Sequence, residues 1–215
     1  MLSDVLLIED KHQEAARKIY ERIEKVRNGR FVVAISGESG SGKTELSHCL
    51  ANIYKNAGLK AKPMHTDNYY MSLPEERNQW REAHGRESIG DTEYDWETIN
   101  KNLADFRAGK VTEMPCVDIV TDQVDRLITD FAGVDVLILD GLYAIKTDDV
   151  DMRVFIDITY EQTKKAQLRR GKEAQTPFRT MVLEREHEVV TSLRKMGDLF
   201  VTHSYEVYAK EEYLK

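Results

Sequence analysis

The stretch of this 215-residue chain with the clearest chemical meaning runs from residue 37 to residue 44 and reads G-x-x-x-x-G-K-[ST]. It follows the apolar run 31–35 and precedes a helix-compatible segment, the setting that a phosphate-binding loop requires. The backbone N–H groups of such a loop and the positive end of the next helix favour an anion. The pattern therefore predicts a triphosphate site formed by Gly37, Glu38, Ser39, Gly40, Ser41, Gly42, Lys43 and Thr44.

Two oxygen-bearing side chains are candidates for a Mg²⁺ site beside this loop. Thr44 would bind the ion through its hydroxyl, while Lys43 would place positive charge on the β- and γ-phosphates. Asp140 ends the apolar run 134–140, which is the Walker B pattern, and such an acid holds the magnesium shell or positions water. The alternative for Asp140 is an ordinary aspartate at the end of a strand.

A third acid, Asp67, follows the short predicted strand 59–66, which its proline makes irregular, and precedes Asn68, Tyr69 and Tyr70. A carboxylate at the end of a parallel strand lies at the ligand-binding edge of the sheet. Asp67 could instead be a turn or N-cap residue, and the two tyrosines could serve only in packing.

The elements that must position these residues alternate between strand and helix patterns. This alternation predicts an α/β fold of the P-loop NTPase type, a three-layer arrangement in which a parallel sheet is flanked by helices. We expect helices over residues 10–27, 45–57, 74–83, 96–108, 161–170 and 179–196, and strands over residues 30–36, 59–66, 134–140, 153–158 and 199–201.

The length suits a single domain over residues 1–215. Within it we expect an N-terminal helix in residues 1–29, and an insertion over residues 71–120 at the ligand edge, because long connections there usually carry function. The segment 171–178, between a basic helix and a long charged helix, is expected to be a loop.

The composition of the chain indicates which classes of partner it can bind. A formal net charge of −7 and a pI near 5.5 argue against nucleic acid and favour a small-molecule partner. No apolar run approaches the length of a membrane span, and the first nine residues are unlike a secretory signal, so we predict a cytoplasmic protein without a membrane partner. Cys49 and Cys116 form no metal or disulfide pattern. The oligomeric state stays open, a homo-oligomer included.

Taken in order, these motifs resemble the uridine kinase and phosphoribulokinase group of P-loop kinases, over about residues 30–196. The resemblance implies ATP- and Mg²⁺-dependent phosphorylation of a hydroxyl on a small-molecule acceptor. The stretches that carry it are residues 37–44, 67–70, 90–97, 114–118 and 140–141 and the basic segment near residue 170.

The resemblance also implies roles for individual residues. Asp67 would be the general base that accepts the proton of the acceptor hydroxyl, Tyr69 and Tyr70 would line the acceptor pocket, and Asp91 would contact the hydroxyls of the substrate. The insertion 71–120 would form the substrate-binding side of the site.

A small lid over residues 169–180 is the last feature that the resemblance implies. Its basic residues, with Arg170 and Arg179 foremost, would close over the triphosphate and bring positive charge to the transferring group. The alternative is a basic surface helix. Glu186 and His187, in the following helix, are expected to be solvated.

One departure from the family pattern concerns the acceptor. Val117 and Asp122 stand where uridine kinases present a tyrosine and a histidine that recognise the base. We therefore expect uridine to be a poor substrate, with Asp122 favouring a donor-rich or cationic group. The alternatives are a uridine or cytidine kinase proper and a non-catalytic or hydrolytic P-loop switch, although the guanine signature N-K-x-D is missing.

Overall fold

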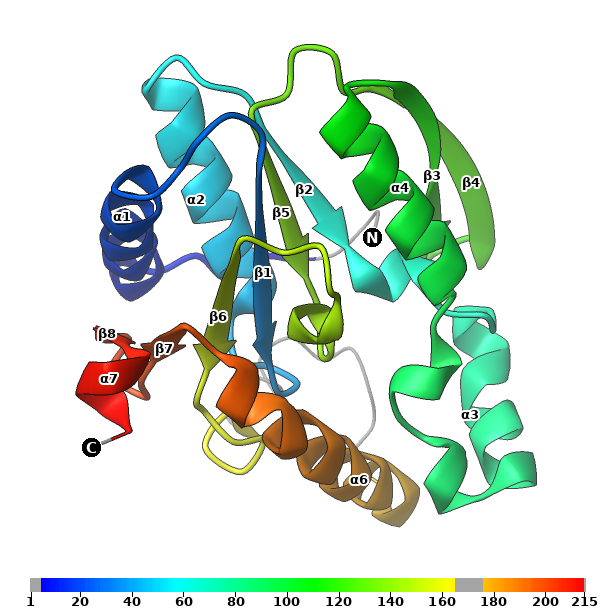
Figure 1. The fold of residues 1–215 in the computed structure, drawn as a ribbon. Coiled ribbons are helices and arrows are strands. Elements are labelled where there is room, and N and C mark those ends of the chain that lie inside the picture. Colours follow the sequence, from blue (N-terminus) through cyan, green and yellow to red (C-terminus); the bar gives the residue numbers. More distant parts are fainter. Residues whose placement is uncertain (1–4, 165–175, 215) are drawn as a thin grey trace.

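The computed structural model describes residues 5–164 and 176–214, and a six-stranded sheet forms its centre (Figure 1). The strand order is β2–β5–β1–β6–β7–β8, with the first five strands parallel and β8 antiparallel to β7. The strands are β1 (Phe31–Gly37), β2 (Ala61–His65), β5 (Val136–Asp140), β6 (Met152–Ile156), β7 (Leu199–Val201) and β8 (Val207–Ala209).

Helices cover both faces of this sheet, which makes the three layers that the sequence predicts (Figure 1). Helices α1 (Asp10–Glu24) and α2 (Lys43–Asn56) pack on one face, where Val33 and Ile35 of β1 point. Helices α4 (Trp96–Ala108) and α6 (Pro177–Leu193) pack on the other face, together with Val32 and Ala34. The central strand β1 is buried throughout because alternate side chains enter opposite cores.

A separate two-stranded sheet lies beside α4 and corrects the predicted organisation of the middle of the chain (Figure 1). Strands β3 (Val111–Asp118) and β4 (Gln123–Asp130) pair as an antiparallel hairpin that runs beyond the expected insertion 71–120. This hairpin was not predicted, because β4 is exposed along nearly its whole length. Its residues therefore show no alternation of buried and exposed positions.

Most element boundaries fall within a few residues of the prediction. Helix α3 (Pro74–His84) and α4 follow the expected stretches closely, and α6 begins at Pro177, capped by the Thr176 hydroxyl, which accepts from the Arg179 amide at 3.1 Å. The antiparallel strand β8 and the short helix α7 (Lys210–Tyr213) were not expected. Most of the predicted lid and of the helix 161–170 lies outside the described residues.

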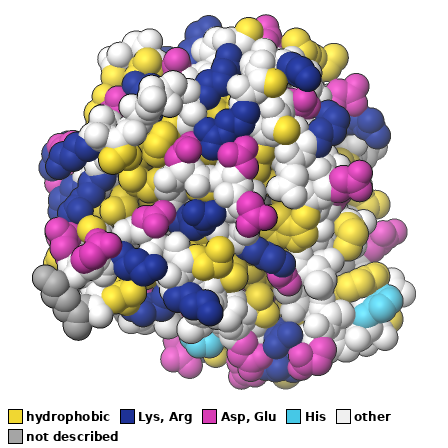
Figure 2. Space-filling model, in the orientation of Figure 1, with side chains coloured by type: hydrophobic (Ala, Val, Ile, Leu, Met, Phe, Trp, Pro, Cys, Tyr) yellow, Lys and Arg dark blue, Asp and Glu magenta, His cyan; other side chains and the backbone are white. Residues whose placement is uncertain are grey.

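The surface carries interspersed basic and acidic side chains on the face that Figure 2 shows. Among the described residues, no helix combines the length and the apolar character needed to cross a membrane.

Candidate functional site

The loop after β1 has the shape of a phosphate cradle. Gly42 precedes α2 with φ of 88°, a conformation that a side chain would strain, and Lys43 begins the helix. The Lys43 ammonium donates to the Glu38 carbonyl at 2.9 Å, and the Ser41 amide donates to the same oxygen at 3.1 Å. These two bonds close the loop on itself, and the loop ends at the positive, amino-terminal end of α2.

A brace from two distant parts of the chain supports the back of this loop. The Tyr205 hydroxyl donates to the Ser41 carbonyl at 2.6 Å and lies 3.2 Å from Nε2 of buried His12. Because Nδ1 of His12 accepts from the Glu9 amide at 2.9 Å, Nε2 carries the proton of the neutral ring and donates to Tyr205. A Cβ on Gly42 would collide with the Tyr205 hydroxyl, so the brace also requires glycine there.

Thr44 and Asp140 lie together at the edge of the sheet, with the threonine hydroxyl 3.5 Å from Oδ1 of the carboxylate. His65, which faces Asp140 across the β2–β5 register, contacts Oδ2 through Nδ1 at 2.8 Å. Burial acts to raise the pKa of Asp140, but the charge and hydrogen bond of His65, together with a hydrogen bond from Ser47 and the charge of Lys43, leave that pKa below its usual value. Burial likewise acts to lower the pKa of His65, and Asp140 raises it overall.

These two hard oxygen donors fit a Mg²⁺ ion. Among the described residues, no group of three histidine, cysteine or acidic side chains could hold a metal ion by itself. Mg²⁺ commonly takes only one or two protein oxygens and completes its shell with water and substrate phosphates. Thr44 and Asp140, beside the cradle, supply such a pair.

Helix α6 binds the first half of the cradle at two successive residues. Glu38, which is 6% exposed, accepts from the Tyr160 amide at 2.6 Å and contacts Nδ1 of His187 at 2.7 Å. The Ser39 hydroxyl donates to Glu186 at 3.1 Å. The prediction that Glu186 is solvated is wrong, because this residue is buried against the loop. The His187 side chain is 38% exposed and also contacts the loop through Glu38.

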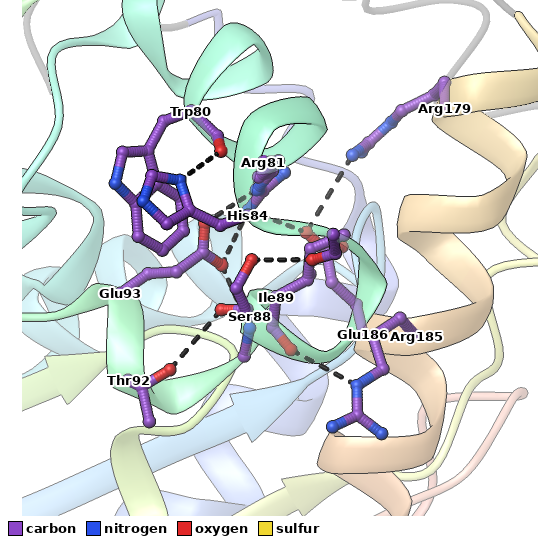
Figure 3. A network of polar contacts seen from close by, with 12 residues as sticks. Trp80, Arg81, His84, Ser88, Ile89, Thr92, Glu93, Arg179, Arg185 and Glu186 are labelled. Atoms are coloured by element: carbon purple, nitrogen blue, oxygen red, sulfur yellow. Dashed lines mark hydrogen bonds and ion pairs between the residues drawn. The ribbon is translucent and has the colours of Figure 1, made fainter.

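Glu186 continues into a buried network of charges, drawn in Figure 3. Its Oε1 lies 3.6 Å from Arg81 of α3 and 3.9 Å from Arg179 at the start of α6. Arg81 in turn donates two hydrogen bonds, of 2.7 and 3.0 Å, to Glu93. The network thus joins the phosphate loop to α3 and to residues 90–93.

Asp67 lies in a short 3₁₀ turn (Thr66–Tyr69) two residues beyond His65, so it emerges at the same edge as Asp140. It is half-buried and makes no hydrogen bond or ion pair with residues 5–164 or 176–214. Tyr70 packs its ring 4.1 Å from that of Tyr94. Tyr69, by contrast, is a core residue whose hydroxyl donates to Asn102 at 2.8 Å, which corrects the expectation that it lines an acceptor pocket.

Both carboxylates assigned to substrate contact already have protein partners. Asp91 forms an ion pair with Lys146. Asp122 lies in the β3–β4 turn and accepts from the Glu75 amide at 3.2 Å, in the first turn of α3. One of its oxygens thus serves the exposed amino-terminal turn of α3. Val117 is buried.

The site therefore differs in part from the predicted set. The structure brings together the cradle, Asp140, Asp67 and Tyr70, while Arg170 lies outside the described residues. Sequence reasoning missed Arg81 and Glu93, which no local pattern marks, and the brace formed by His12 and Tyr205. The pairing of His65 with Asp140 could have been found, because both residues end neighbouring strands.

The fold and the loop define a P-loop nucleotide-binding protein of the α/β class. More specifically, residues 32–176 match the model of the Phosphoribulokinase / Uridine kinase family, and the chain belongs to that family. The brace residues His12 and Tyr205 lie outside the matched segment.

Two relatives extend this comparison. The chain is 29% identical over 211 residues to the bifunctional alpha-galactosidase/sucrose kinase of Mediterraneibacter gnavus, a match that covers 90% of this chain and 23% of that protein. It is 30% identical over 133 residues to a uridine kinase of Ureaplasma parvum serovar 3, covering 59% of this chain and 62% of that enzyme. The chain thus spans less than two thirds of either relative.

A solved structure with a similar fold is a putative fructose transport system kinase from Silicibacter sp. TM1040. Its TM-score is 0.58 at 19% identity, and the match covers 86% of this chain and 93% of that one. At this identity the likeness establishes the fold alone.

Proposed function

We propose that this protein is an ATP- and Mg²⁺-dependent kinase that phosphorylates a hydroxyl of a small neutral carbohydrate. The single observation that carries the proposal is the half-buried carboxylate of Asp67, which makes no hydrogen bond or ion pair with residues 5–164 and 176–214 and lies at the same sheet edge as the phosphate loop and Asp140. A nucleotide switch has no need of such a carboxylate.

Asp67 would act as the general base. The acceptor oxygen attacks the γ-phosphorus of ATP, the bond between that phosphorus and the β–γ bridging oxygen breaks, and ADP leaves. The hydroxyl proton passes to Asp67. Phosphoryl transfer needs little other covalent help, so alignment of the acceptor and stabilisation of charge supply most of the catalysis.

The opposite side of the site would hold the donor. The cradle amides and Lys43 would bind the phosphates, and Arg179, 3.9 Å from Glu186, would turn its guanidinium toward the transferring group. Thr44 and Asp140 would hold Mg²⁺, which supplies positive charge to the phosphate oxygens when bound.

The choice of a carbohydrate rests on two observations. The match to the bifunctional alpha-galactosidase/sucrose kinase covers 90% of this chain, whereas the match to the uridine kinase covers 59% of it. In addition, Val117 is buried and Asp122 caps α3, so neither provides the hydrogen bonds that a pyrimidine base would need. A site without those groups loses its preference for the base.

A nucleoside kinase is the second candidate, favoured by the identity to uridine kinases over the family core. The experiment that separates the two measures phosphate transfer from ATP to sucrose, D-fructose, uridine and cytidine, beside a reaction without acceptor. We expect a sugar to be the best acceptor. A higher kcat/KM for uridine than for both sugars would favour the nucleoside kinase, and equal ATP consumption without acceptor would favour the hydrolytic switch.

A further inference from the structure

Several buried polar groups near Asp67, the hydroxyls of Thr66 and Tyr94 among them, make no hydrogen bond with any described residue. Two of these groups are the Nε and Nη2 atoms of Arg77, on α3, and the hydroxyl of Tyr143, in the segment after β5. Buried donors are rarely left unpaired, because leaving water without a new partner costs free energy. A guanidinium, moreover, keeps its proton at any ordinary pH. The chain therefore holds donors that a bound molecule could satisfy.

Both groups border one aromatic cluster. The guanidinium carbon of Arg77 lies 3.4 Å from the centre of the Tyr70 ring. Tyr70 packs against Tyr94, and Tyr143 meets Tyr94 edge-on with ring centres 5.6 Å apart. Because Tyr70 is only three residues beyond Asp67, this cluster adjoins the proposed general base.

The charges in the cluster agree with this position. Burial raises the pKa of the Tyr70 hydroxyl, Asp67 raises it further, and Arg77 lowers it. Asp67 and Arg77 therefore both act on one hydroxyl, with opposite signs. Two other described arginines have hydrogen-bond acceptors in the protein: Arg81 pairs with Glu93, and Arg153 donates to backbone carbonyls.

The chemistry of the unpaired donors indicates the ligand. Nε and Nη2 lie on one edge of the guanidinium and present a fork that matches two neighbouring oxygen atoms. The positive charge of Arg77 already lies over the Tyr70 ring, whereas its Nε and Nη2 donors still lack hydrogen-bond acceptors. An anionic acceptor would also meet the negative charge of Asp67.

We infer that Arg77 binds two adjacent hydroxyl oxygens of a neutral, polyhydroxylated acceptor and that Tyr143 donates to a further oxygen of the same molecule. This assignment rests on the proposed kinase function. It makes α3, through Arg77, the element that reads the acceptor, while the neighbouring Arg81 ties the same helix to the phosphate loop through Glu186. Acceptor recognition and donor binding would thus share one helix.

The test compares Arg77→Lys and Tyr143→Phe with matched surface controls, Arg126→Lys on β4 and Tyr208→Phe on β8. Arg77→Lys keeps the charge and removes the fork. With ATP and sucrose or D-fructose, we expect the acceptor KM to rise about 10- to 100-fold for Arg77→Lys and about 3- to 10-fold for Tyr143→Phe, with the ATP KM unchanged. Calorimetry of sugar binding without nucleotide should show the same losses, and the controls should show none.

Monodeoxy derivatives of the better sugar give a second, sharper readout. Removal of a hydroxyl that Arg77 binds should weaken the wild-type enzyme, yet cost Arg77→Lys little more, because the partner is already lost. D-glycerate serves as the anionic probe. Unchanged acceptor KM and affinity in both variants would overturn the inference, as would a preference for D-glycerate that Arg77→Lys abolishes. A wild-type protein that phosphorylates none of these acceptors would overturn the proposed function itself.

Discussion

Replacement of Glu186 by glutamine tests the buried network that joins the phosphate loop to α3. Glutamine keeps an oxygen that can accept from the Ser39 hydroxyl, but it removes the negative charge that faces Arg81 at 3.6 Å and Arg179 at 3.9 Å. The change therefore isolates the charge of Glu186 from its shape and from its contact with the loop.

The magnitude follows from what the remaining partners retain. Complete loss of one partner of a buried ion pair costs about 3–5 kcal/mol. Here Arg81 keeps two short hydrogen bonds to Glu93, and both ion-pair distances to Glu186 exceed 3.5 Å, so we expect about 2 kcal/mol. For a domain of this size that corresponds to a fall in Tm of roughly 4–8 °C.

Urea unfolding gives the measurement, because a lower midpoint with an unchanged m-value reports stability alone. The control is Glu188→Gln, two residues further along α6. The Glu188 carboxylate contacts Arg86 and Arg185 at the surface, so its charge should contribute little to stability. Nucleotide affinity should stay nearly constant in Glu186→Gln, because the glutamine oxygen can still accept from the Ser39 hydroxyl. Equal unfolding midpoints for the two variants would refute the network as a source of stability.

Three further predictions concern the donor and the chemistry. Lys43→Ala should abolish turnover and weaken binding of a non-hydrolysable ATP analogue in calorimetry, while circular dichroism shows an intact fold; unchanged affinity would remove Lys43 from the phosphate site. Asp67→Asn should lower kcat about 10²- to 10⁴-fold at nearly constant nucleotide affinity, whereas Asp140→Asn should raise the Mg²⁺ concentration for half-maximal rate; equal loss of nucleotide binding in both would place Asp67 in the metal shell. Tyr205→Phe should weaken nucleotide binding by roughly 3- to 10-fold through loss of the brace, and Tyr208→Phe should not; identical affinities would show that the loop holds its shape unaided.

The parallel sheet, its flanking helices and the phosphate loop could be predicted because their signals are local. An apolar run such as 31–35 and the spacing of glycines before Lys43 report the structure directly. The β3–β4 hairpin could not be predicted in the same way, since its outer strand is exposed and buries no periodic face.

The site was predicted in part for a related reason. Asp140 ends β5 and Asp67 lies two residues beyond the end of β2, and strand ends meet at one edge of a parallel sheet. The partners of a carboxylate, however, depend on elements that are distant in sequence: Asp122 is used by α3, and Glu186 turns inward to Ser39. Sequence spacing carries no information about such contacts, so a substrate role and a structural role look alike until the fold is known.

Transfer of labelled phosphate from γ-labelled ATP to a sugar tests the central claim most directly. Wild-type protein, Asp67→Asn and Lys43→Ala would each be incubated with Mg²⁺ and with sucrose or D-fructose, and the products separated and identified by mass spectrometry. We predict a labelled sugar phosphate with the wild-type protein, only traces of it with Asp67→Asn, and none with Lys43→Ala. Label released only as inorganic phosphate, at the same rate with and without sugar and in both wild type and Asp67→Asn, would contradict the claim.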